Sequence, residues 1–350
     1  RNGEKNIGFV DYLVYVLYFP KLLMGPLVDP KSFLNELQTV RGVDYRSIVE
    51  GIQRIVVGLF KKVIVAEAMI NAVEWGSNYI SESTALDLII VSFAYTMQIY
   101  FDFCGYSDIA IGVSKMFNIY LPNNFDSPYR ATSISDFWRK WHISLTNFLT
   151  DYVYIPLGGN RKGRARTYFN ILIVFLVSGI WHGANWTFLI WGALHGVYQI
   201  LEKELRPVVR KINGYCHTKT ASFGYRFAKA AVTFALVDFA WIFFRADSVK
   251  QALYYVKRMI SFCDMWSLFD GSLYTMGLDV QEIHILMIGL TGLIVVDCLQ
   301  YLKQKKIAEL LLGQWCVFRW AILIYLIVSC IVLGYYGQGF ESANFIYLQF

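Results

Sequence analysis

Long apolar segments separated by short loops run through most of this chain. Five of them predict membrane-crossing helices, because each has about the length and hydrophobicity that a bilayer requires. They are residues 168–181, 186–201, 227–244, 283–301 and 318–336. A further span is predicted at 85–101, followed by the more polar stretch 102–108. The 33 residues from Tyr168 to Ile200 contain no Lys, Arg, Asp or Glu, which suits only lipid or a very large core. We therefore predict an all-α, polytopic transmembrane protein.

Two segments near the N-terminus predict helices of another kind. Residues 9–28 are apolar but contain Pro20, Lys21, Gly25 and Pro26, which predicts a broken or re-entrant segment. Residues 48–75 have helical periodicity and carry several charged side chains, which predicts a tilted helix lying partly in the membrane interface. These charged residues are Arg54, Lys61, Lys62 and Glu67.

Residues 133–154 predict a helix that dips into the membrane while packed against protein. Ser133 and Asp136 match a capping box, so the helix is expected to begin near Ile134 and to end before Pro156. The segment mixes tryptophans with charged residues and a histidine, which is too polar for lipid and too aromatic for an ordinary surface. The sequence thus predicts re-entrant and interfacial helices beside the spans.

Composition supports a membrane protein with a single domain. Hydrophobic residues make up 56% of the chain and charged residues only 17%, whereas soluble domains carry about 25% charged residues. The net charge of +6 does not indicate nucleic-acid binding, because the basic residues lie in short loops where they set topology. The six cysteines are scattered without a CxxC pair, so no metal site is expected. The chain begins at Arg1 without a signal-peptide pattern, so we expect one membrane-embedded domain over 1–350 that lacks some N-terminal residues or helices.

Loop charges predict the topology. Loops 157–167, 202–224 and 302–317 are basic and are expected on the cytoplasmic side. The segment 245–282 has balanced charges and is expected outside, like the C-terminal tail. Residues 168–201 would then form a helical hairpin entered from the cytoplasm, with His182 at its tip.

Three histidines and one aspartate in or near the apolar segments are candidates for chemistry. His182 lies between Gly179 and Gly183 and is either a proton acceptor or a structural histidine at a helix break. His142 and Trp138 are four residues apart and are expected to share a helix face; taken alone, an interfacial aromatic and basic anchor explains them better. Arg139 and Lys140 are expected to point towards phosphate or headgroups.

The other polar residues of the apolar segments have simpler interpretations. His195 is expected to be a packed polar residue between helices. Asp238 is expected to face the interior and to pair with Arg226, Lys229 or Arg245. Asp108 and Asp297 are interpreted in the same way. The chain has no GxSxG, HExxH, P-loop or dinucleotide motif, and its histidines lack the acids or thiols of a zinc site.

Two motifs together resemble the membrane-bound O-acyltransferase family. The first is Ser133–Leu145, which includes Phe137-Trp138-Arg139-Lys140-Trp141-His142 and continues at Asp151–Asn160; the second is Gly179–Trp186. Their order and the forty-residue separation of the histidines also fit, and the C-terminal segment 344–350 is similar to the bacterial alginate O-acetylation branch. The teichoic-acid D-alanylation branch is a more distant match. Lys140 and Thr150 depart from the usual motif, where arginine is frequent.

The resemblance implies a function and its residues. His182 would be the catalytic base and His142 the second catalytic residue. The residues expected to bind substrate are Trp138, Trp141, Asp136, Asn185 and Arg139. His182 would remove the proton of a hydroxyl acceptor as it attacks an acyl thioester, while His142, Asn185 or a backbone N–H stabilises the oxyanion.

The resemblance also implies substrates and partners. No tightly bound cofactor is expected, and the donor would be acetyl-CoA or an acyl-carrier protein, attracted by Arg161, Lys162, Arg164 and Arg166 unless these serve topology alone. The expected partners are membrane lipid, an extracytoplasmic partner transferase and an acyl-carrier protein, and no nucleic acid. The expected location is the bacterial cytoplasmic membrane, with acetylation of a cell-envelope polysaccharide as the process. D-alanyl transfer to teichoic acid and a non-catalytic transporter of acyl donor or lipid are the alternatives.

Overall fold

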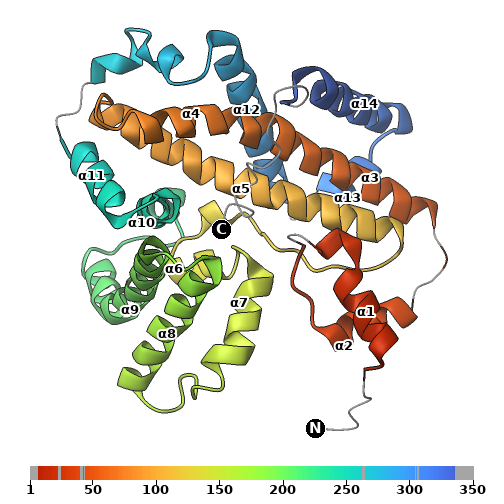
Figure 1. Ribbon diagram of the computed structural model, residues 1–350, viewed down its shortest axis with the longest axis horizontal. Coiled ribbons are helices and arrows are strands. Elements are labelled where there is room, and N and C mark those ends of the chain that lie inside the picture. Colours follow the sequence, from red (N-terminus) through yellow and green to blue (C-terminus); the bar gives the residue numbers. More distant parts are fainter. Residues whose placement is uncertain are drawn as a thin grey trace. The chain divides into compact units, whose positions relative to one another are not determined.

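The computed structural model describes residues 7–22, 25–39, 42, 44–261, 265–303, 305 and 307–335. Within these ranges every regular element is a helix, as expected for an all-α membrane protein (Figure 1). In the described part of the chain five helices are long and apolar enough to cross a membrane, so the chain is a polytopic membrane protein. They are α5 (Ala85–Met116), α8 (Arg164–His182), α10 (Phe223–Arg245), α12 (Val280–Lys303) and α14 (Cys316–Leu333).

The predicted spans agree with these helices in all but two places. The span at 85–101 is too short: α5 continues to Met116, so the polar stretch 102–108 is helical too. The segment 186–201 belongs to α9 (Trp186–Tyr215), which is not among the five; its apolar part contains His195 and Gln199 and ends at the charged Glu202 and Lys203. The predicted end of the last span, Tyr336, and the C-terminal motif at 344–350 lie outside the described residues.

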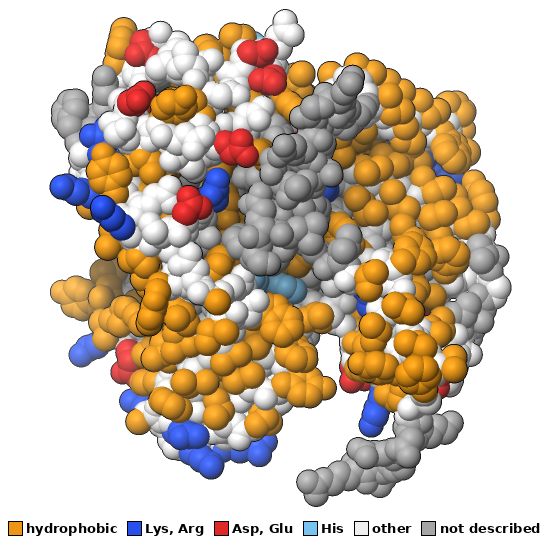
Figure 2. All heavy atoms as spheres, in the orientation of Figure 1, with side chains coloured by type: hydrophobic (Ala, Val, Ile, Leu, Met, Phe, Trp, Pro, Cys, Tyr) orange, Lys and Arg blue, Asp and Glu red, His pale blue; other side chains and the backbone are white. Residues whose placement is uncertain are grey.

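The helices pack into two compact units. The first takes in residues 1–68, 98–124 and 280–349. Its helices besides α12, α14 and the second part of α5 are α1 (Phe9–Leu17), α2 (Pro30–Gln38), α3 (Tyr45–Leu59), the π-helical segment η2 (Phe60–Ala66) and α13 (Ile307–Leu312). Pro20 lies in a short 3₁₀ turn, η1 (Phe19–Lys21), which confirms that the first apolar segment is broken. Figure 2 shows hydrophobic side chains (orange) over the exposed face of α14.

Glycines bring α3 and α5 into backbone contact in the first unit. A Cβ on Gly58 would lie 2.6 Å from the carbonyl oxygen of Gly105, and one on Gly112 would lie 2.7 Å from that of Gly51. Such close approach requires small residues, as is typical of helix packing in membranes.

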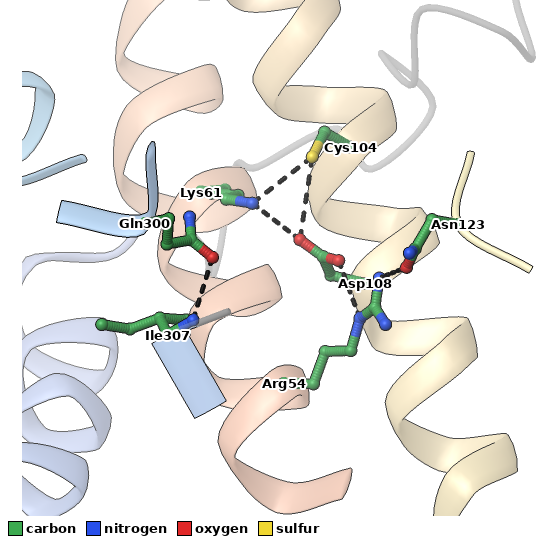
Figure 3. A network of polar contacts seen from close by, with 7 residues as sticks. All are labelled: Arg54, Lys61, Cys104, Asp108, Asn123, Gln300 and Ile307. Atoms are coloured by element: carbon green, nitrogen blue, oxygen red, sulfur yellow. Dashed lines mark hydrogen bonds and ion pairs between the residues drawn. The ribbon is translucent and has the colours of Figure 1, made fainter. Parts of the chain in front are cut away.

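A half-buried polar network also joins α3, η2 and α5 in the first unit (Figure 3). Asp108 accepts from Arg54 Nε at 2.9 Å and from Lys61 Nζ at 2.7 Å, and Arg54 also donates to Asn123. Lys62 pairs in the same way with Asp102. The prediction that Asp108 pairs with a base is confirmed, and the basic side chains of segment 48–75 pair with carboxylates of α5.

The second unit takes in residues 69–97 and 125–279, and it carries all three candidate histidines. Its helices besides α8, α9, α10 and the first part of α5 are α4 (Glu67–Asn78), α6 (Ile134–Trp138), α7 (Ile143–Leu149), the π-helical segment η4 (Thr150–Tyr154), α11 (Val249–Met259) and the 3₁₀ turns η3 (Pro128–Arg130), η5 (Met265–Leu268) and η6 (Ser272–Thr275).

Segment 133–154 is not one helix, as the sequence predicted, but three short ones. Ser133 does cap the first, because its Oγ accepts from Asp136 N at 3.1 Å, whereas the Asp136 carboxylate accepts from Thr132 N rather than from Ser133 N. The helix ends at Trp138 and the chain restarts after His142, whose φ of 44° and ψ of 53° are left-handed. The prediction that Trp138 and His142 share a helix face is therefore wrong.

Asp238 has partners other than those predicted. Its carboxylate accepts from Ser92 Oγ at 2.9 Å and Thr96 Oγ1 at 2.5 Å, both on α5, rather than pairing with Arg226, Lys229 or Arg245. Hydroxyl groups satisfy the carboxylate here without the desolvation of a second charge.

Candidate active site

His182 is the last residue of α8, at the tip of the hairpin that α8 forms with α9. The side chain is buried, with 7% exposed, and packs edge-on against Trp191 and Phe244, whose ring centroids lie 5.3 and 5.2 Å from that of the imidazole. Gly183 ends the helix with a φ of 158°. The hairpin expected from the sequence is thus present, and its tip holds an imidazole among aromatic rings.

Two glycines set how closely the hairpin arms approach. A Cβ on Gly179 would lie 2.4 Å from the carbonyl oxygen of Phe188, and one on Gly192 would lie 2.3 Å from that of Phe175. Neither approach leaves room for a methyl group. The backbones of α8 and α9 therefore pack directly against each other over the two turns below His182.

His142 lies close to His182 although the two are forty residues apart in sequence. It occupies the left-handed position between α6 and α7, and 8% of its surface is exposed. Burial lowers the pKa of His142 to about 3, and the nearby His182 imidazole contributes to the lowering. His142 is therefore neutral at physiological pH, so one of its ring nitrogens carries a proton that it can donate.

His195 supports the site from α9. It is fully buried, and its Nδ1 accepts from Trp138 Nε1 at 3.2 Å, which leaves the proton of the neutral ring on Nε2. Its ring also packs against Trp191 at 5.3 Å. This arrangement matches the prediction of a packed polar residue between helices, and it gives Trp138 a definite partner.

The remaining predicted site residues lie around these histidines in the same unit. Trp141 is buried, with its ring 5.2 Å from that of Trp241. Asp136 pairs with Arg139 and Lys140, at 3.4 and 3.2 Å, and the Arg139 side chain is 74% exposed. The expectation that these bases point towards phosphate or headgroups stays a prediction.

Asn185 has a structural role in the hairpin turn. Its Oδ1 caps α9 by accepting from Thr187 N at 3.2 Å, and its Nδ2 donates to the carbonyl oxygen of Asp247 at 3.0 Å. The Asn185 amide thereby ties the turn after His182 to the end of α10.

Sequence reasoning missed the aromatic side chains that enclose His182. Trp191 and Phe244 touch the imidazole directly, and Trp241 stacks on Trp191 with ring centroids 5.6 Å apart. Trp191 lies four residues before His195 on α9, which was a usable signal because such residues share a helix face. Phe244 and Trp241 come from α10, and no local pattern links them to His182.

The chain is similar to known proteins over much of its length. Residues 4–269 match the model of the MBOAT, membrane-bound O-acyltransferase family. The chain is 40% identical over 254 residues to a peptidoglycan O-acetyltransferase of Helicobacter pylori, covering 72% of this chain and 47% of that protein. It is 38% identical over 263 residues to a probable alginate O-acetylase of Azotobacter vinelandii, covering 75% and 50%.

A third relative is more distant. The chain is 28% identical over 204 residues to a teichoic acid D-alanyltransferase of Bacillus subtilis, covering 55% of this chain and 52% of that protein. The chain thus spans about half the length of the relatives that it matches.

Proposed function

This chain belongs to the membrane-bound O-acyltransferase family, and we propose that it transfers an acyl group, acetyl, from a thioester donor to a hydroxyl acceptor. The observation that carries the proposal is the meeting of His142 and His182 in one buried cluster, from two motifs forty residues apart. An imidazole is the side chain best suited to take a hydroxyl proton near neutral pH.

His182 is proposed as the general base. Its unprotonated nitrogen takes the proton of the acceptor hydroxyl while the hydroxyl oxygen attacks the thioester carbonyl carbon. The carbonyl electron pair moves to oxygen, and collapse of this intermediate breaks the carbon–sulfur bond and expels a thiolate. The thiolate then receives the proton from the His182 imidazolium. The surrounding Trp191 and Phe244 rings keep water from the base, which limits hydrolysis of the thioester.

His142 is proposed as the donor that stabilises the oxyanion. A neutral imidazole offers one N–H, and the burial that lowers its pKa keeps it neutral. Asn185 is less suited to this role, because both ends of its amide already bond to the backbone of the hairpin turn and of residue 247. Trp138, Trp141, Asp136 and Arg139 are proposed to shape the site around bound substrate.

The substrate assignment rests on the relatives. One is named as a peptidoglycan O-acetyltransferase and another as a probable alginate O-acetylase, so acetyl is proposed as the acyl group and an envelope polysaccharide as its destination. Transfer of the acetyl group to the polysaccharide is proposed to need an extracytoplasmic partner transferase. The chain is proposed to lie in the bacterial cytoplasmic membrane. The donor is proposed to be acetyl-CoA or an acyl-carrier protein, attracted by the exposed basic residues before α8 and in its first turn, Arg161, Lys162, Arg164 and Arg166. Figure 2 shows Lys and Arg side chains (blue) at the lower edge of the same unit.

Removal of the His182 imidazole tests the proposal. Membranes containing the full-length His182→Ala protein are expected to release no thiol from an acetyl thioester in the presence of a hydroxyl acceptor, since the base is absent. His217→Asn is the matched control, because His217 is exposed and its left-handed backbone, with a φ of 47°, suits asparagine. Acyl transfer by a folded His182→Ala protein at the wild-type rate would refute the assignment.

D-alanyl transfer is the second candidate, favoured by the identity to the Bacillus subtilis protein. A direct comparison separates the two: the wild-type protein is offered acetyl and D-alanyl thioesters of the same carrier. Preference for the acetyl donor is expected, and preference for the D-alanyl donor would replace acetyl in the proposal.

A further inference from the structure

A cavity lies in the unit that carries His182, on a face of α10 that does not touch this histidine. Its enclosed volume is about 30 Å³, and about 440 Å³ of space lies between its walls when the part open to the outside is included. Its walls are mainly apolar and come from α4, the turn after it, α5 and α10: Val73, Ile80, Val91 and Ile242 are among them. Mainly apolar walls with a few polar groups suit an alkyl or acyl group.

The rim of the cavity carries a different chemistry. Arg245, the last residue of α10, and Gln251 of α11 both line it. Gln251 Oε1 accepts from Asp247 N at 2.8 Å, so the amide is held in place and its Nε2 group, which has no hydrogen bond within the described part of the chain, is available as a donor. The rim therefore combines a guanidinium group with an amide donor, which together suit an anion.

The charge of Arg245 is only weakly neutralised by its neighbours. Its ion pair with Asp247 is 3.9 Å long, and the Asp247 side chain is 80% exposed, so solvent screens it. The C-terminus of α10 also attracts a cation through the helix dipole, but that effect is worth only a fraction of an ion pair. The guanidinium thus retains the capacity to bind a further anion.

The position of the cavity relates it to the membrane. The cavity lies beside the end of α10, at Arg245, and beside the early turns of α5, which begins at Ala85. Both helices are candidate membrane spans. Ends of spans lie at the depth of the lipid headgroups. The charged rim is therefore at headgroup depth, and the apolar walls extend towards the depth of the acyl chains.

We propose that this cavity is a binding site for an anionic phospholipid. The phosphate is held by Arg245 and Gln251, and the start of an acyl chain lies between the apolar walls. A guanidinium group suits the phosphate of such a lipid, and apolar walls suit its acyl chain. The proposal does not depend on the acyl-transfer chemistry at His182.

Lipid retention by the full-length protein tests this site. The protein is reconstituted in phosphatidylcholine vesicles with or without phosphatidylglycerol, extracted in mild detergent, and its bound lipids are counted by native mass spectrometry. Wild-type protein is expected to retain phosphatidylglycerol, and Arg245→Gln to bind it about tenfold more weakly, as expected for loss of a charged hydrogen bond. Ala246→Phe, which adds a ring at the cavity wall, is expected to lose the lipid without loss of charge.

Lys250→Gln is the matched control. Lys250 is an exposed cation near the same end of α10 but does not line the cavity, so its removal is expected to leave retention unchanged. Equal phosphatidylglycerol retention by wild-type and Arg245→Gln proteins would overturn the proposal. An equal thermal stabilisation by inorganic phosphate alone would overturn the assignment to a lipid, because it would show that the apolar walls add nothing.

Discussion

A methyl group at Gly192 should separate the arms of the hairpin that ends at His182. In Gly192→Ala the new Cβ would lie 2.3 Å from the carbonyl oxygen of Phe175, where ordinary van der Waals contact begins at 3.4 Å. The obstacle is helix backbone, which no rotamer change can move aside. The two helices must therefore move apart by about 1 Å.

The magnitude follows from two opposing effects. Overpacking against rigid backbone costs about 3 kcal/mol, at the upper end of the usual range. Replacing a helical glycine by alanine returns about 1 kcal/mol of helix propensity. The net loss of stability is therefore about 2 kcal/mol. Displacement of a catalytic group by about 1 Å costs about 100-fold in rate, so acyl transfer should suffer more than folding.

Gly196→Ala is the matched variant on the same helix. There the nearest atom to the new Cβ is Leu172 Cδ1, at 3.1 Å, the tip of a side chain that can rotate away. This variant should keep wild-type activity and gain up to about 1 kcal/mol of stability. Thermal unfolding in detergent and acyl transfer in membranes are measured for both proteins. A Gly192→Ala protein as stable and active as Gly196→Ala would refute the backbone-contact argument.

Three other substitutions are expected to have measurable effects. Asp108→Asn leaves its two basic partners without a carboxylate and should lower stability by about 3–5 kcal/mol in thermal unfolding; an unchanged transition would show that the network contributes little. Trp138→Phe leaves His195 Nδ1 without its donor and should cost about 1–3 kcal/mol by the same assay, whereas a neutral result would mean that the bond is not formed. The lowered pKa of His142, about 3, means that the unfolded chain binds more protons below pH 6.5, so wild-type stability should fall on acidification from 6.5 towards 3. Between pH 7.5 and 5 the free energy of unfolding of His142→Asn should fall by about 2 kcal/mol less than that of the wild type. Identical pH profiles of stability for the two proteins would contradict this reasoning.

The hairpin and its histidine were predictable from local pattern. The uncharged run around Tyr168–Ile200 defined two apolar arms, and the glycines beside His182 marked the turn between them. Ser133 was recognised as a helix cap because a side-chain cap depends only on residues close in sequence. Each of these features arises from interactions within a few residues, which is why sequence patterns reveal them.

The break at His142 and the partners of Asp238 were not predictable in this way. Helical spacing through 133–154 gave no sign of a left-handed residue, since the turn is stabilised by tertiary packing of Trp138 and Trp141. The hydroxyls that bind Asp238 lie more than 140 residues earlier in the chain, on α5. A buried carboxylate predicts that partners exist, but not whether they are bases or hydroxyls.

The left-handed backbone at His142 limits which mutations a lineage can accept there. With a φ of 44°, the position favours glycine, asparagine and aspartate, whereas β-branched residues are strained and proline cannot adopt it. Codons for asparagine and aspartate differ from those for histidine by one nucleotide. A duplicated gene can therefore exchange this imidazole in a single step and retain the turn. We expect such duplicates to persist as folded membrane proteins whose loss of this side chain leaves the architecture intact.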